Sequence, residues 1–439
     1  MRIVQIVPGA GGSFYCENCL RDAGLVGALR AAGHEVLLVP LYLPLAADGA
    51  EAPADGAAPA DAPMFFGGVN VYLQQKSSLF RKTPRWLDKL LDSPRLLKWA
   101  ASKAGMTSAR DLAETTLSML QGPDGRQTKE LQRLADFLAG RPPVDVVCLS
   151  NALLLGLAGE IKKRLGSSVA VMLQDEDMFL DDLPEPYSAR CWQAVAERCA
   201  DADVFLAVSK YYAERMRVRL GLDARRLRVV YTGIDAGGYV PAAHPQRPPT
   251  IGYLSRACRE FGLDVLVDAF ILLKADARFG DARLRVAGGS TAADGPFLGE
   301  VRGRAASANV LHDIDFLPDF DRPARQEFLR GLSVLSAPVR HAEAFGMYVL
   351  EALACGVPAV LPRRGAFPEL AEATGGCLLC EGDDPPALAA AISDLLAAPA
   401  ACRELGRRGR QAVLERFTLE RMAAEVTDIY RQVAGEQRN

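Results

Sequence analysis

Short apolar segments alternate with amphipathic segments along the whole chain, and this alternation restricts the folds that it can adopt. The first two strand-like segments, at 2–7 and 35–40, enclose a glycine-rich break and a helical segment at 17–32. Further strand-like segments of the first half lie at 144–149, 169–173, 204–208 and 227–231. Strands that alternate with helices are typical of a parallel sheet covered on both faces. The first half is therefore predicted to form one doubly wound domain.

Glycine and proline become dense at 237–249, where the pattern pauses, and this composition indicates a linker. A second alternating series follows, with strands predicted at 250–254, 284–287, 332–336 and 358–361 and helices at 263–274, 347–354 and 386–397. The expected fold class is therefore α/β, with two doubly wound domains that face each other across a central cleft. Such folds bind ligands at the carboxyl ends of their strands.

Length and composition agree with two large domains. At about 150 to 200 residues per domain, 439 residues make two or three units, which excludes a small disulfide-stapled scaffold. The 51 basic residues nearly balance the 54 acidic ones, so a protein that wraps nucleic acid is not expected. The chain also lacks a signal-peptide pattern and an apolar stretch of about 18 residues, which favours a cytoplasmic protein with reduced cysteines.

Two segments of the first half do not fit the sheet pattern. Residues 46–63 are rich in Pro, Ala, Gly and Asp, and we expect a loop there. Residues 76–103 hold eight basic side chains against two acidic ones, with three aromatic residues among them, and begin a helical insert expected at 76–137. This basic stretch is either a solvated helical face or a surface for an anionic acceptor or a membrane headgroup. The second alternative predicts peripheral contact with the inner membrane face.

The most informative stretch, 341–358, carries two carboxylates eight residues apart, Glu343 and Glu351, around a Phe-Gly break and a helix. Gly346 is expected to open that helix with its first amide groups free, and those amides together with the helix dipole suit a phosphate. Glu351, about two turns into the helix, has the acceptor oxygens that a ribose diol requires. Glu343, on the preceding loop, would reach another part of the same ligand, such as sugar hydroxyls.

The spacing of Glu343 and Glu351 resembles the E-x7-E motif of the retaining family 4 glycosyltransferases, which have the GT-B architecture of two facing Rossmann-like domains. Other segments resemble that family in the same order along the chain, namely Gly11-Gly12, 33–36, 232–235, 365–369 and 421–433. The resemblance covers nearly the whole chain except 46–63 and the basic stretch. It implies an acceptor-binding domain at 1–240, a nucleotide-sugar domain at 241–417 and a last helix at 418–439 that crosses back to the first domain.

The same resemblance implies where a donor binds. A nucleotide sugar, UDP- or GDP-linked, is expected mainly on the second domain, with Glu351 on the ribose and Glu343 as a catalytic residue near the donor sugar. The other donor contacts implied are the amides of Phe345, Gly346 and Met347 and the glycine loop of Gly11 and Gly12. Members of the family usually need no metal, because helix-end amides and a cation clamp can stabilise the leaving diphosphate. Arg256 matches the arginine of that clamp.

Two positions depart from the family pattern. The family usually has a lysine directly before the glycine at 262, where this chain has Phe261, so Arg259 is the candidate for the second cation. A guanidinium two positions away has a different reach and a forked geometry. Many members also place a histidine against the donor sugar where this chain has Gln174, which can donate and accept hydrogen bonds but cannot carry a proton. The acidic residues after Gln174 either orient hydroxyl groups or form a solvated loop.

Two Cys-x-x-Cys pairs, Cys16 with Cys19 and Cys377 with Cys380, leave several interpretations open. The first pair follows the glycine loop at an expected helix start and suits a redox pair, half of a zinc site or neither. The second pair lies in a strand-like run, so its side chains should point to opposite faces and one of them should be buried. The remaining histidines lack metal-ligand spacing, and no metal is expected. His341 would either line the cleft or support a residue that does.

These observations predict a retaining glycosyltransferase that moves a hexose from a nucleotide sugar to a hydroxyl group of a glycan, lipid or small molecule, in glycan or glycolipid synthesis. No enzymic nucleophile is evident, so the diphosphate oxygens are expected to take the acceptor proton. A phosphorylase or an epimerase is disfavoured, because the chain shows no lysine placed for pyridoxal phosphate and no array of histidine and carboxylate. The alternative from another class, motivated by Phe261 and Gln174, is a catalytically weak or silent protein that binds nucleotide sugars.

Overall fold

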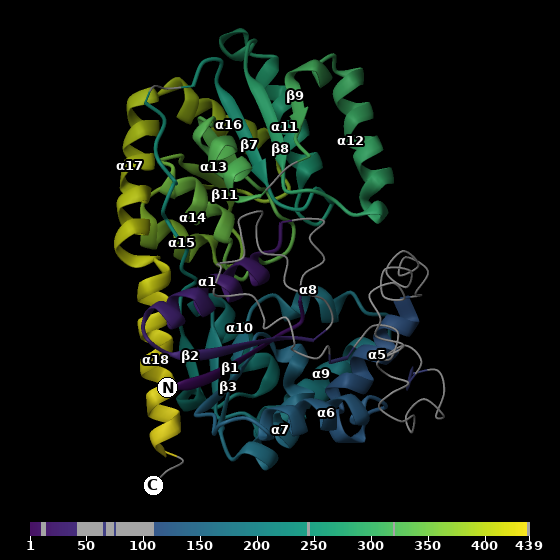
Figure 1. Cartoon of the computed structure of the whole chain (residues 1–439). Coiled ribbons are helices and arrows are strands. Elements are labelled where there is room, and N and C mark those ends of the chain that lie inside the picture. Colours follow the sequence, from purple (N-terminus) through teal and green to yellow (C-terminus); the bar gives the residue numbers. More distant parts are fainter. Residues whose placement is uncertain are drawn as a thin grey trace.

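The computed structural model describes residues 1–9, 15–41, 65–66, 74–75, 109–243, 246–318 and 321–436. The predictions for Gly11 and Gly12, for the loop at 46–63 and for the basic stretch at 76–103 concern residues outside these ranges. Figure 1 shows that the first and second halves of the chain form separate α/β domains that face each other.

The first half folds into one parallel sheet of six strands, in the order β2-β1-β3-β4-β5-β6. Its strands are β1 (Arg2–Val7), β2 (Glu35–Pro40), β3 (Val146–Leu149), β4 (Ser168–Leu173), β5 (Val204–Ala207) and β6 (Leu227–Val229). The central strands β3, β4 and β5 are buried at every residue, as apolar strands covered on both faces should be. The doubly wound sheet predicted for this half is confirmed.

Helices cover both faces of this sheet (Figure 1). They are α1 (Glu17–Ala31), α7 (Ala158–Leu165), α8 (Glu176–Asp181), α9 (Tyr187–Arg198) and α10 (Lys210–Leu220). Between β2 and β3, the described part of the expected insert contains α5 (Ala109–Leu120) and α6 (Thr128–Ala139). Both helices bury an apolar stripe with helical spacing, and they pack on α9 and α7 respectively.

The second half forms another parallel sheet of six strands, in the order β12-β11-β10-β7-β8-β9. Its strands are β7 (Thr250–Leu254), β8 (Arg283–Ala287), β9 (Ile314–Phe316), β10 (Val334–Ser336), β11 (Ala359–Pro362) and β12 (Cys377–Cys380). The strand predicted at 332–336 thus begins two residues later. β9 escaped prediction, because three residues with an exposed Asp315 at their centre carry little strand signal.

The helices of the second half cover both faces of its sheet. They are α11 (Leu263–Lys274), α12 (Gly295–Ser307), α13 (Arg322–Arg330), α14 (Met347–Ala354), α15 (Phe367–Thr374), α16 (Pro385–Ala397) and α17 (Pro399–Arg416). Within the described ranges, no single helix is long and apolar enough to span a membrane. Only α16 and α17 together reach such a length and composition, across a bend of 99°.

The last helix, α18 (Leu419–Glu436), leaves the second domain and packs on the first, beside α1 (Figure 1). A buried cluster joins it to the first domain, made of Met422, Val426 and Tyr430 with Ile3 and Leu25. The chain therefore passes between the domains twice, once before β7 and once between α17 and α18. The two crossings contact each other, because the Ile234 amide donates to the Phe417 carbonyl at 2.9 Å.

The carboxyl ends of the two sheets meet between the domains. Strand order reverses between β1 and β3 in the first sheet and between β7 and β10 in the second. Loops that leave such neighbouring strands in opposite directions open a crevice for ligands at the carboxyl edge. The loops after β1 and β4 touch the loop after β10 across this region, through Glu17 with Met347 and Asp175 with Ala344. These loops carry the candidate site.

Candidate active site between the two domains

The start of α14 is shaped to receive an anion. Gly346 precedes the helix with φ at +90°, a conformation that favours glycine, and a Cβ atom there would lie 2.8 Å from the Phe367 ring. The Met347 amide donates to Glu17 Oε2 at 3.0 Å, and the Tyr348 amide lies 3.5 Å from Glu17 Oε1. A carboxyl group of the first domain thus occupies the helix start at which the sequence predicts a phosphate.

Glu343 lies beside the same helix start, on the loop between β10 and α14, and is buried. Its Oε2 atom is 3.1 Å from His341 Nε2 and accepts the Tyr348 hydroxyl at 3.4 Å. Gly365, on the loop after β11, has φ at +59°, and a Cβ atom there would lie 2.4 Å from the Glu343 carbonyl oxygen. The glycine of the 365–369 segment is therefore needed where that loop passes the Glu343 backbone.

Three carboxyl groups, from Glu17, Asp175 and Glu343, gather around this helix start. Asp175 Oδ1 accepts the Ala344 amide at 3.2 Å. Burial, followed by the charge of Glu343, raises the pKa of Glu17 and that of Asp175 well above their usual values. Burial alone would lower the pKa of His341, but the charge of Glu343 and the contact with it raise that pKa to about 9. The cluster therefore keeps His341 protonated at neutral pH and disfavours three simultaneous negative charges.

Glu351, on α14, is buried and accepts hydrogen bonds from three separate segments. Its Oε2 atom accepts the Tyr15 hydroxyl at 2.8 Å, and its Oε1 atom accepts the Tyr239 hydroxyl and Arg325 Nε, the latter at 3.2 Å. Burial, and then the Glu351 charge, raise the pKa of Tyr15 well above its usual value, so this hydroxyl remains a donor. Tyr15 belongs to the first domain, and each carboxylate oxygen can accept two hydrogen bonds. Oε2 has one partner among the described residues, which leaves it acceptor capacity for a ligand.

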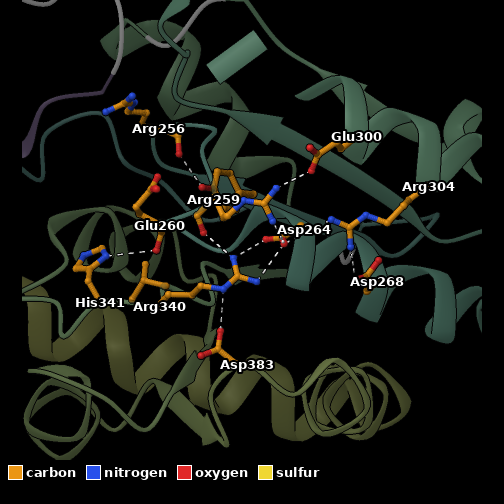
Figure 2. Close-up of polar contacts among 12 residues, drawn as sticks. Arg256, Arg259, Glu260, Asp264, Asp268, Glu300, Arg304, Arg340, His341 and Asp383 are labelled. Carbon is orange, nitrogen blue, oxygen red and sulfur yellow. Dashed lines mark hydrogen bonds and ion pairs between the residues drawn. The ribbon is translucent and has the colours of Figure 1, made fainter. Parts of the chain in front are cut away.

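The two arginines predicted for a cation clamp form ion pairs with neighbouring acids. Arg256 binds Asp294 through Nε and Nη2, at 3.0 and 2.8 Å, and Arg259 Nη2 binds Glu300 at 2.6 Å. Figure 2 shows the guanidinium groups of Arg259, Arg304 and Arg340 converging on Asp264, while that of Arg256 points away from them. The two predicted cations are therefore arranged separately, and each shares its charge with an acid.

Phe261, the residue in place of the expected lysine, lies against the loop that follows β10. Its ring meets the His341 ring edge-on, with the ring centroids 4.8 Å apart. His341 Nδ1 also lies 3.4 Å from the Glu260 carbonyl oxygen (Figure 2). Phe261 thus packs against the imidazolium that contacts Glu343.

Gln174 lies at the end of β4 but turns into the first domain. Its Oε1 atom accepts Arg21 Nη1 at 2.6 Å, and Arg21 also binds Asp22 and the Ser150 carbonyl. Both Gln174 and Arg21 are buried. The Gln174 side chain therefore fixes α1 to the sheet instead of pointing toward Glu343. The next residue, Asp175, contacts the second domain by accepting the Ala344 amide.

The 365–369 segment connects the domains at a second helix start. Glu369, on α15, accepts the amides of Lys210 and Tyr211 at 2.9 and 3.0 Å, and so caps α10 of the first domain. The Ser209 hydroxyl donates to the Ala344 carbonyl at 2.7 Å. Close by, the buried Phe345 ring packs near the rings of Tyr231 and Phe417. Each domain thus provides a carboxyl group to a helix start of the other domain. Glu17 contacts the start of α14, and Glu369 contacts the start of α10.

Sequence reasoning missed the first-domain residues of the site, above all Tyr15 and Glu17. The sequence places Glu17 at the start of the helix expected at 17–32 and between Cys16 and Cys19, and it places Tyr239 in a linker, without a site role for either. Each has its partner more than 100 residues away in the sequence, where no spacing rule applies. Within the described ranges, no three His, Cys, Asp or Glu side chains are arranged to hold a metal ion.

A cavity of about 820 Å³ lies elsewhere, at the opposite edge of the second sheet. Its lining includes Pro249, Ser333 and Pro358, which directly precede β7, β10 and β11. Glu343 follows β10, so it lies at the other end of the same strands. This cavity is therefore separate from the candidate site.

Comparison with known proteins agrees with this geometry. Residues 241–412 match the family model described as glycosyl transferases group 1, and residues 116–237 match the model described as Glycosyltransferase Family 4. A GDP-mannose-dependent alpha-(1-6)-phosphatidylinositol monomannoside mannosyltransferase of Mycolicibacterium smegmatis is 25% identical over 84% of this chain and 96% of its own length. A D-inositol 3-phosphate glycosyltransferase of Salinispora tropica is 26% identical over 73% of each chain.

Solved structures define the fold class. A sucrose-phosphate synthase of Thermosynechococcus elongatus superposes with a TM-score of 0.72 over 99% of this chain and 100% of its own, at 18% identity. Anabaena HepE in complex with UDP gives a TM-score of 0.67 over 98% and 100% of the two chains, at 15% identity. The fold is the GT-B fold of two facing Rossmann-like domains. The two family models agree with this fold, and each of them matches a part of one domain.

Proposed function

We propose that this protein transfers a hexose from a UDP- or GDP-linked sugar to an acceptor hydroxyl, with retention of configuration at the transferred carbon and without a metal, in glycan or glycolipid synthesis. One observation carries the proposal. The Glu17 carboxyl group sits on the first amides of α14, between the buried carboxylates Glu343 and Glu351. An acidic group at that point supports an anion site there, and the two carboxylates provide acceptors for hydroxyl groups near it.

The donor would bind as follows. Its diphosphate replaces the Glu17 carboxyl group on the Met347 amide, and its ribose hydroxyls donate to Glu351, whose Oε2 atom has acceptor capacity left. Its sugar then lies near Glu343, which the protonated His341 contacts. As the glycosidic bond breaks, charge develops on the leaving diphosphate, and the α14 amides stabilise it. A diphosphate oxygen takes the acceptor proton.

The names of similar proteins support the classes of donor and acceptor. The Mycolicibacterium protein uses GDP-mannose and acts on a phosphatidylinositol mannoside, and the Anabaena structure holds UDP. Both names fit a nucleoside diphosphate on the second domain. A lipid-linked or otherwise anionic acceptor would suit the basic stretch at 76–103, which lies outside the described residues.

A second candidate function is suggested by the small number of cations available for a diphosphate. Arg256 and Arg259 are each paired with an acid, and Phe261 stands where the family resemblance leads us to expect a lysine. A site with fewer available cations stabilises a leaving diphosphate less well. The alternative is therefore a protein that binds nucleotide sugars with weak or no turnover.

The deciding experiment is a thermal-shift panel with UDP, GDP, ADP and TDP on the wild type, on Glu351→Gln and on the distant control Glu404→Gln. A ligand at 100 times its Kd adds about 2.7 kcal/mol to the stability of the folded state, which moves the midpoint by a few degrees in a chain of this size. We expect one nucleotide to shift the wild type and the control but not Glu351→Gln. No shift with any of the four contradicts both candidate functions.

Turnover then separates the two functions. With the nucleotide sugar whose base the panel selects, a transferase hydrolyses the donor slowly or glycosylates an acceptor, and NMR of the product reports the retained anomer. Binding without release of the nucleoside diphosphate supports the silent protein instead.

A further inference from the structure

The loop that carries Tyr15 and Glu17 also carries two neighbouring thiols. Cys16 is the residue directly before α1, and Cys19 lies one turn into that helix. Their sulfur atoms are 2.6 Å apart, and both are free, partly exposed thiols. A disulfide requires a separation of about 2.05 Å, so the bond can form with a movement of less than about 1 Å. The helix start itself therefore need not change.

The two thiols differ in their readiness to react. The hydrogen bond from Cys19 lowers the pKa of Cys16, although burial opposes this effect. The same contact, followed by burial, raises the pKa of Cys19. A thiolate directly before a helix also gains from the helix dipole. Cys16 is thus the attacking group and Cys19 the resolving group, the division of roles found in reactive Cys-x-x-Cys pairs.

The second Cys-x-x-Cys pair provides an internal comparison. Cys377 and Cys380 lie on β12, where residues three apart point to opposite faces. Cys377 Sγ contacts the Thr374 hydroxyl at 3.8 Å, whereas Cys380 Sγ donates to the Leu361 carbonyl at 3.6 Å. Both are partly buried, so the expectation that one of them would be fully buried is wrong. The Cys-x-x-Cys spacing alone therefore does not make a pair reactive. The position of Cys16 at a helix start does, because it brings the two thiols together.

We infer that Cys16 and Cys19 form a redox-active pair whose closure to a disulfide holds Tyr15 and Glu17 against the second domain. Tyr15 and Glu17 flank Cys16, and they contact Glu351 and the Met347 amide. A cross-link through the first turn of α1 stiffens the segment that carries Glu17. The Glu17 carboxyl group must leave the start of α14 when a diphosphate takes its place. The consequence for donor binding rests on the function proposed above, whereas the formation of the disulfide does not.

The chemistry is a thiol–disulfide exchange with a small-molecule disulfide as oxidant. The Cys16 thiolate attacks one sulfur of that molecule, forms a mixed disulfide and releases a first thiolate. Cys19 then loses its proton to solvent and attacks Cys16 Sγ, which releases the second thiolate. Two protein thiols are oxidised to one disulfide, and the small disulfide is reduced to two thiols.

The test is to treat the full-length protein with oxidised glutathione, quench it in acid, alkylate the remaining thiols and map the peptides by mass spectrometry. We expect the peptide with Cys16 and Cys19 to escape alkylation, to lack two hydrogen atoms, and to become fully alkylated after dithiothreitol. In the same sample both Cys377 and Cys380 should be alkylated. In Cys19→Ser, Cys16 should retain glutathione as a mixed disulfide. Alkylation of Cys16 and Cys19 in the treated wild type overturns the proposal.

A second measurement tests the link to the donor site. The affinity for the nucleotide selected by the thermal-shift panel should fall by about fivefold in the oxidised protein, because the Glu17 carboxyl group becomes harder to displace from the Met347 amide. The double variant Cys16→Ser, Cys19→Ser should be indifferent to glutathione. Equal affinity in both redox states overturns the link. If no nucleotide binds either state, the proposed function fails, and the thiol mapping still decides whether the pair is redox-active.

Discussion

Glu17 and Met347 are 330 residues apart in the sequence, yet the Glu17 Oε2 atom accepts the Met347 amide at 3.0 Å. The contact joins the first turn of α1 to the first turn of α14, and therefore one domain to the other. It also places an acidic group where the proposed donor has its diphosphate. Donor binding and domain closure consequently compete for the same amide, and this competition can be measured.

Removal of the Glu17 carboxyl group should tighten nucleotide binding. In Glu17→Ala the diphosphate no longer displaces a cap of about 1 kcal/mol, so we expect affinity to rise by up to about fivefold in calorimetric titration. Asp384→Ala is the matched control, because Asp384 caps α16 of the second domain through the Ala387 amide. That variant should lose a similar amount of stability and keep wild-type affinity. Weaker binding by Glu17→Ala would mean that Glu17 contacts the ligand directly.

A cation at position 261 should strengthen the donor site. Phe261→Lys introduces an ammonium group beside His341, and a charged hydrogen bond to phosphate contributes about 1.5 to 3 kcal/mol. We expect the Kd for the nucleoside diphosphate to fall about tenfold or more. Phe261→Leu, which removes the ring contact without adding charge, should leave the Kd near that of the wild type. Equal Kd values for Phe261→Lys and Phe261→Leu would show that position 261 lies out of reach of the diphosphate.

The stability of the protein should fall as the pH rises from about 6.5 to 9. The pKa of His341 is raised from 6.5 to about 9, so its stabilising effect is complete below pH 6.5 and is lost as the pH passes through 9. The shift corresponds to at most about 3 kcal/mol. The groups that face His341 are Glu343, Asp175 and the Glu260 carbonyl, and the raised pKa of Asp175 acts in the same direction. In urea unfolding, His341→Gln should show a smaller loss over this range, and a loss equal to that of the wild type would remove His341 as the cause.

The close passage of Gly365 over Glu343 should make this glycine hard to replace. In Gly365→Ala the new Cβ would lie 2.4 Å from the Glu343 carbonyl oxygen, in a backbone conformation with φ at +59°. Gly375→Ala has nearly the same φ, +60°, but its Cβ would meet only one atom, at 4.0 Å. We expect about 1 kcal/mol of destabilisation from the backbone conformation in both variants. Gly365→Ala should cost clearly more and should also weaken nucleotide binding. Similar costs in denaturant unfolding would contradict the overlap.

The elements of the fold were largely predictable from the sequence, because their signals are local. β1, β2 and β7 and the helices α11 and α14 have the predicted bounds. Each combines a short apolar run with a glycine or proline at its end, which are features of adjacent residues. β9 lacks such a run, and only its pairing with β8 makes it a strand.

Only the part of the candidate site that lies on the loop and helix at 343–351 was predictable from the sequence. Glu343 and Glu351 belong to one motif on one loop and helix, so their spacing carries information. Their partners Glu17, Asp175 and Arg325 come from distant parts of the sequence, and only the folded chain brings them near. The position of Gln174 was misleading for a similar reason. The buried Arg21 on α1 donates a hydrogen bond to the Gln174 side chain, and no local sequence pattern predicts this contact.

Ile234 and Thr418 pair as an isolated parallel bridge at the place where the chain crosses between the domains in both directions. The two crossings are tied together there, so they form one hinge with a fixed pivot instead of two independent tethers. A swing about this pivot separates Glu17 from α14 and Glu369 from α10 in a single movement. Entry of the donor proposed above would then be coupled to one opening movement about Ile234 and Thr418.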